Sequence, residues 1–147
     1  INHLMITVLL LVANYFFTNV FSWAVSDSLQ QWIQSLPLLV QVVILVITAD
    51  FVLYWSHRFY HEVPGLWKLH AIHHSVEYMD WLAGSRNHIV PTFSYRIFAI
   101  IPLYLIGPDK AALDIYIVFA AFQAVYVHAN VNIPLGSLQY QIGSAHV

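Results

Sequence analysis

The sequence of 147 residues has no cysteine and few charged side chains. Without cysteine there are no disulfides and no thiolate ligands, so any bound metal must use nitrogen or oxygen ligands. The net charge is -2, and no basic patch is present to meet the phosphates of a nucleic acid. The composition therefore argues against nucleic acid as a partner and against thiol chemistry.

The scarcity of charge also argues against a soluble domain. Charged residues make up 8% of the chain and hydrophobic residues 60%, whereas soluble globular proteins carry about 25% charged residues. So few charges cannot cover a surface that faces water. We therefore expect lipid to cover much of the surface of this chain, which is at most one domain long.

Four apolar segments approach the roughly 20 residues that a helix needs to cross a bilayer. Residues 4–25 form the first, and they lack the basic start and cleavage motif of a signal peptide. Residues 36–55 form the second, after a polar 26–35 segment interpreted as a loop. Residues 91–106 and 111–127 are shorter, which leaves open a hairpin that dips into the bilayer. We expect an all-α integral-membrane bundle with about four membrane helices and a histidine-rich helical cap.

Basic residues predict the orientation of this bundle. Three of the five lie within residues 56–90 and Arg96 lies just beyond, whereas the 26–35 segment has none. Lysine and arginine mark the cytoplasmic side of membrane proteins. We therefore expect the 56–90 segment and both chain ends in the cytoplasm, with the protein in a bacterial inner membrane or the endoplasmic reticulum.

Five histidines crowd into the stretch HRFYHEVPGLWKLHAIHH. They are His57, His61, His70, His73 and His74. The first two are four apart and the last three stand at i, i+3 and i+4, so each set lies on one face of a helix. The Pro-Gly pair at 64–65 predicts a helix end and a chain reversal between the sets. A lone histidine is more often a packed core residue, but five together repel when protonated and need many partners when neutral. Metal coordination resolves both problems.

Four histidines lie outside this cluster. His88 and His128 stand at predicted helix–membrane boundaries on the same side, which makes both candidate ligands. His3 and His146 lie near the chain ends and are assigned to solvent or to the membrane interface.

Asp50 is a carboxylate within an apolar span, where ionisable residues are usually functional. It shares one helical stripe with Tyr54 and the first two clustered histidines. We predict that it accepts the spare N–H of a ligating imidazole, which fixes the ring. A structural ion pair with Arg58 or Arg86 is the alternative.

The ligand set favours iron. Zinc proteases with an HExxH motif are excluded, because Arg58 follows His57 where the general base would stand. Haem needs two axial ligands rather than five. Many imidazoles without thiolate suit two metal ions, and iron activates oxygen for attack on a lipid C–H bond. A non-catalytic membrane protein that binds or transports metal, and a haem electron carrier, remain as alternatives.

The stretch DFVLYWSHRFYHEVPGLWKLHAIHHS, residues 50–75, resembles the fatty acid hydroxylase and sterol desaturase superfamily of integral-membrane di-iron enzymes. The likeness continues through SRNH and the HANV and PLG motifs, so it covers roughly residues 36–143. It implies two irons, with His128 matching a family ligand after the later helix pair. It also implies hydroxylation, desaturation or ether cleavage of a lipid, with O2 and electrons from a cytochrome b5- or ferredoxin-type partner.

The sequence departs from this family at two points. The family has a further HxxHH box after PLG, and this chain ends before one appears. We therefore interpret residues 1–147 as a single membrane domain that lacks its third box and is inactive as it stands; His146 is either the first member of that box or a neighbour of it. Asn132 stands where some members carry a second histidine, and it is predicted to lie near the ligands with Asp50, Tyr54 and Arg86.

Overall fold

A computed structural model describes residues 8, 11, 12, 15, 16, 19–78, 80 and 83–129. Ten of the 22 residues of the predicted span at 4–25 lie outside the described residues, as do His3, Asn132 and His146. The helices are α2 (Asp27–Ser35), α3 (Leu38–Glu62), α4 (Pro64–His74), α5 (Ile89–Ile106) and α6 (Lys110–Tyr126), with short 3-10 turns at η1 (Ser22–Ala24) and η2 (Ala83–Ser85). The described part contains no strand, which confirms the all-α prediction.

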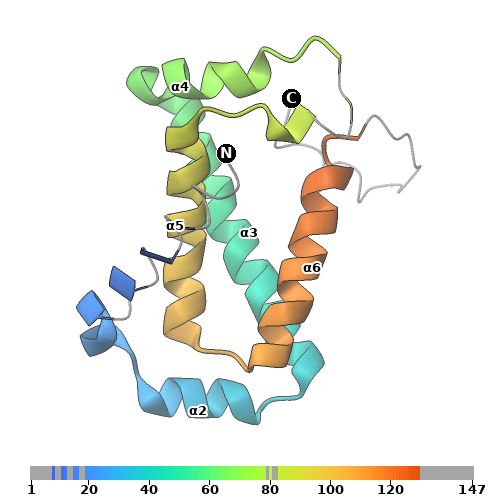
Figure 1. Ribbon diagram of the computed structural model, residues 1–147. Helices are drawn as coiled ribbons and strands as arrows, with labels where there is room; N and C mark the ends of the chain where they lie inside the picture. The colour runs from blue at the N-terminus through green and yellow to red at the C-terminus, as the bar shows by residue number, and fades with distance from the viewer. Residues whose placement is uncertain are drawn as a thin grey trace.

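The central helix of the fold is α3. Both α5 and α6 pack along it, while α2 lies at one end of the bundle and α4 crosses the other end of α3 and α5 (Figure 1). The shared core contains Leu45 and Ala49 of α3, Leu103 of α5 and Ala112 of α6. The two alanines are almost fully buried, and such small residues let membrane helices approach closely.

Within the described residues, α3 and α5 are long and apolar enough to cross a membrane. Only 17% of the apolar stretch of α3 and 11% of that of α5 is buried inside the structure. A core helix of a soluble protein would be mostly buried, so these uncovered apolar faces are suited to lipid. Since α6 has 17 residues, it is slightly shorter than the roughly 20 residues of a full span.

The prediction of a loop at residues 26–35 is wrong, because this segment forms the helix α2. Ser26 caps the helix by accepting a hydrogen bond from the backbone N–H of Leu29 at 3.3 Å. One face buries Ile33. Gln34 Nε2 donates to the carbonyl of Gly107 at 2.8 Å and ties α2 to the end of α5. The polar residues that predicted a loop therefore cap a helix and bond it to the end of α5.

A buried amide fixes this same end of the molecule. Gln41 of α3 accepts a hydrogen bond from the backbone N–H of Asp109 at 2.9 Å, and its Nε2 donates to the carboxylate of Asp109 at 2.9 Å. Its Nε2 also lies 3.0 Å from the Leu36 carbonyl. His57 and His61 lie at the opposite end of α3, so these hydrogen bonds hold the helices together at a distance from the histidines.

Candidate metal centre

The two histidine boxes face each other where α3 ends and α4 begins. His57 and His61 lie one turn apart near the end of α3, and His70 and His74 lie one turn apart near the end of α4. A single extended residue separates the helices, and Pro64 begins α4, where its missing N–H leaves no helical hydrogen bond unmade. The predicted break between the two histidine sets at this proline is confirmed. It brings ligand atoms of all four histidines within 4.8 Å of one another.

The spacing of these ring nitrogens fits ligands of a common metal ion. The Nε2 atoms of His57 and His61 are 2.9 Å apart, and those of His70 and His74 are 3.0 Å apart. Two nitrogens bound at about 2.1 Å to one ion lie about 3.0 Å apart at a right angle and about 3.4 Å apart at the tetrahedral angle. Imidazole nitrogen is a ligand that iron and zinc both accept. The four histidines therefore suit such an ion.

His73 and His128 form a further pair beside these four. Their Nε2 atoms are 3.3 Å apart and both side chains are buried. The ring centre of His73 lies 5.4 Å from that of His70 and 5.2 Å from that of His74. The structure thus places the pair next to the group of four, an arrangement that suits two neighbouring metal positions.

His88, the remaining predicted ligand, caps α5 in the structure. Its Nδ1 accepts a hydrogen bond from the backbone N–H of Val90 at 3.2 Å. In a neutral ring an accepting Nδ1 leaves the proton on Nε2. The capping contact accounts for this side chain, and its role as a ligand stays a prediction.

Two of the side chains predicted to lie near the ligands, Asp50 and Tyr54, are exposed on α3. Asp50 is exposed and stands seven residues before His57, about 10 Å away along the helix axis. The Tyr54 hydroxyl accepts a hydrogen bond from Arg58 at 3.4 Å, and Arg58 pairs with Glu62 at 2.7 Å. This arginine therefore forms an ordinary helix-surface pair. The predicted contact between Asp50 and an imidazole stays a prediction.

Three ring nitrogens of the candidate ligands have hydrogen-bond partners that were not predicted from the sequence. They are Nδ1 of His70 with the Tyr95 hydroxyl at 3.3 Å, Nδ1 of His73 with the Arg86 carbonyl at 3.2 Å, and Nδ1 of His128 with the Ala124 carbonyl at 2.7 Å. Partners of this kind fix the orientation and tautomer of a ligating imidazole. Arg86, predicted to lie near the ligands, contributes its main-chain carbonyl. Of these three contacts, only the one with the Ala124 carbonyl could have been predicted from the sequence, because Ala124 lies one helical turn before His128.

Burial favours the neutral form of two imidazoles of α4, those of His73 and His74. The pKa of His73 is lowered from the ordinary 6.5, mainly by burial, although its bond to the Arg86 carbonyl acts in the opposite direction. The pKa of His74 is also lowered, again mainly by burial and next by the proximity of His61. A histidine must be neutral to bind a metal. The site therefore favours the protonation state that coordination requires.

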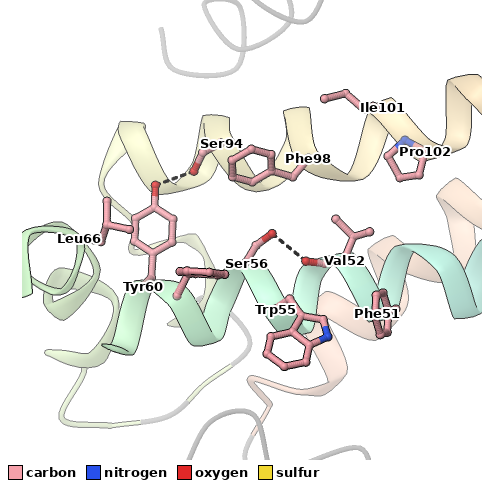
Figure 2. Close-up of a pocket in the computed structure, with 11 residues that line it drawn as sticks. Phe51, Val52, Trp55, Ser56, Tyr60, Leu66, Ser94, Phe98, Ile101 and Pro102 are labelled. Atoms are coloured by element: carbon pink, nitrogen blue, oxygen red, sulfur yellow. Dashed lines mark hydrogen bonds between the residues drawn. The ribbon is translucent and has the colours of Figure 1, made fainter. Parts of the chain in front are cut away.

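An apolar groove of about 620 Å³ runs between α3 and α5 and ends near the histidines. Figure 2 shows Phe51 and Pro102 toward one end, and Tyr60 and Ser94 toward the other, where their hydroxyls are 2.6 Å apart. The ring centre of Tyr60 lies 5.8 Å from that of His70. The Ser56 hydroxyl donates to a carbonyl of its own helix at 2.7 Å, so it adds no open polar group to the lining. The groove suits a hydrocarbon chain whose far end approaches the histidines.

Comparison with characterised proteins finds lipid oxygenases. Over 110 residues the chain is 36% identical to the ornithine lipid hydroxylase of Rhizobium tropici, a match that covers 73% of this chain and 32% of that protein. It is 34% identical over 91 residues to the alkylglycerol monooxygenase of Danio rerio, covering 62% of this chain and 20% of the relative. With methylsterol monooxygenase 2-2 of Arabidopsis thaliana it shares 26% over 94 residues, covering 64% and 35%.

The chain spans about a third or less of the length of these first relatives. No solved structure gives a significant match. The sequence model of the fatty acid hydroxylase family, however, matches residues 42–146. That stretch includes both histidine boxes, the groove and His128, and by this match the chain belongs to the fatty acid hydroxylase family.

Proposed function

We propose that this chain forms the metal-binding core of a membrane-bound, O2-dependent lipid hydroxylase with two non-haem iron ions. One observation carries the proposal: four imidazoles with ligand atoms within 4.8 Å of one another lie beside the inner end of an apolar groove. The relatives are named as hydroxylases and monooxygenases of lipids, which supports hydroxylation over desaturation.

The residues of the chain divide the work between metal and substrate. His57, His61, His70 and His74 would hold one iron, and His73 with His128 would contribute to the second. When bound, the iron pair supplies the activation of O2 that oxidation of an unreactive C–H bond requires. The walls of the groove exclude water and align the chain of the lipid. The bonded hydroxyls of Tyr60 and Ser94 lie at the boundary between this dry groove and the histidines.

Metal analysis combined with an optical spectrum tests the metal half of the proposal. We expect iron without a Soret band in the purified protein, and loss of iron in a His70→Ala variant. A Soret band would indicate the haem carrier instead. Bound metal in full-length protein that transfers no ¹⁸O from ¹⁸O2 to any lipid would favour the metal-binding or transport alternative.

Filling the groove tests the substrate half. Ile101→Trp places a large side chain in the groove lining, whereas Ile117→Trp alters an exposed apolar position on α6. In cells that express the full-length protein, the first variant should lose most ¹⁸O incorporation into lipid and keep its iron. The second should retain both properties. Equal activity of the two variants would contradict a substrate role for the groove.

The proposal includes a cytoplasmic histidine cluster that receives electrons from a cytochrome b5- or ferredoxin-type partner. Ser85, near the histidines, and Ser28, on α2 at the opposite end, are both exposed. In this cysteine-free chain, a cysteine at Ser85 should react with an impermeant reagent only after the membrane is opened. A cysteine at Ser28 should react in intact cells. The reverse pattern would overturn the orientation.

A further inference from the structure

His73 and His128 are held in one tautomer by main-chain carbonyls. Each Nδ1 lies within hydrogen-bond distance of a carbonyl oxygen, at 3.2 Å for His73 and 2.7 Å for His128. A carbonyl can only accept, so each Nδ1 must carry the proton. In a neutral ring Nε2 then presents its lone pair. The two Nε2 atoms are 3.3 Å apart, and two lone pairs at this distance repel unless a cation stands between them.

The segment of residues 84–87, between α4 and α5, contacts both members of this pair. Its Arg86 carbonyl accepts from His73. Its Gly84 lies against the ring of His128, where an added Cβ would stand 2.8 Å from Nδ1 and 3.0 Å from Cγ. Among the described residues, Gly107 is the one glycine with a left-handed backbone. Gly84 is therefore required for the space that its missing side chain leaves, and not for its backbone conformation.

Asn87 holds this segment in shape. Its side-chain amide donates to the Gly84 carbonyl at 2.8 Å, and its backbone N–H donates to the Ser85 carbonyl at 3.1 Å. This turn holds the Gly84 backbone against the ring of His128. It also places the Arg86 carbonyl at Nδ1 of His73. One short loop thereby sets the position of one imidazole and the tautomer of the other.

We propose that residues 84–87 are a positioning segment for the His73–His128 pair and hence for one of the two metal positions. The inference rests on the proposed metal centre and deepens it. It assigns the task to glycine, to a main-chain carbonyl and to an asparagine, none of which is a metal ligand. The atoms nearest to an added Cβ at Gly84 all belong to His128, which is not one of the group of four, so the metal of that group should be unaffected.

The chain offers a matched pair of glycines for the test. Gly84→Val adds a side chain against His128, whereas Gly65→Val adds one where nothing lies within 4 Å of the Cβ. In the full-length protein titrated with Co²⁺, Gly84→Val should weaken the second equivalent at least about tenfold, the loss typical when contacts outside the ligand set are disturbed. The first equivalent should bind as in the wild type. Gly65→Val should leave both equivalents unchanged.

Two milder variants separate positioning from misfolding. Asn87→Ala should weaken the second equivalent in the same direction, and Arg86→Ala should not, because it keeps the carbonyl. The ¹⁵N spectrum of metal-free protein labelled at histidine gives a readout without metal. It should show protonated Nδ1 at His73 and His128 in the wild type and in Arg86→Ala, and a changed His128 signal in Gly84→Val.

The outcomes distinguish this inference from the proposed function. If the wild type shows the protonated Nδ1 signals but binds no metal, the metal centre fails and the positioning of the rings stands. If it binds two equivalents and Gly84→Val does so equally well with unchanged ring signals, the positioning role is refuted.

Discussion

Removing the hydroxyl of Tyr95 should weaken metal binding although this residue is not a ligand. Its Oη lies 3.3 Å from Nδ1 of His70, whose side chain is only 1% exposed, so water cannot easily replace the contact. Tyr95→Phe keeps the ring, which stacks on His57 with an interplanar angle of 23°. The change therefore isolates one hydrogen bond to one ligating imidazole.

The geometry also sets the size of the expected effect. Loss of such a partner typically lowers metal affinity 10–100-fold. At 3.3 Å the bond is slightly longer than the usual range. We therefore expect a loss of about tenfold, or about 1.4 kcal/mol of binding free energy.

Titration of metal-free protein in detergent with Co²⁺, followed by its visible absorption, measures this affinity. Tyr60→Phe is the matched control, because it removes a neighbouring hydroxyl that bonds to Ser94. Its affinity should stay within about twofold of the wild type, since no ligand loses a partner. Wild-type affinity in Tyr95→Phe, with His70→Ala still abolishing binding, would refute the orienting role of the hydroxyl.

Further outcomes follow from the same structure. The pKa values of His73 and His74 are lowered below 6.5, so the folded state binds fewer protons than the unfolded chain. The metal-free protein should therefore lose stability as pH falls below about 6.5 and gain none above it, which thermal unfolding at pH 7.5 and 5.5 measures; equal midpoints would contradict buried neutral rings. Gln41→Leu should destabilise the fold by about 1–3 kcal/mol, since it leaves buried polar partners unmet, without changing Co²⁺ affinity. Asp50→Asn should lower metal affinity about 10–100-fold if this carboxylate orients an imidazole; unchanged affinity would assign Asp50 to another role.

The sequence by itself determined the features that follow from local spacing. Histidines four apart share a helix face, so HxxxH and HxxHH had to present their rings in pairs. Pro64 cannot continue α3 with a full set of hydrogen bonds, and a new helix begins there. Long apolar runs likewise indicated α3 and α5. The same local reasoning wrongly predicted a loop at residues 26–35. Serine and glutamine are as common at the cap and on the polar face of a helix as they are in a loop.

Tertiary structure alone decided which groups surround those imidazoles. Tyr95 is 25 residues from His70 and reaches it only because α5 packs against α3 and α4. The carbonyl of Arg86 belongs to the main chain, which every residue has, so no side-chain pattern indicates that it meets His73. Gly84 gives no signal either until a ring stands where its Cβ would be. Periodicity specifies the face of a helix, but contacts between helices depend on how close their backbones come, and that distance is set by packing across the whole bundle.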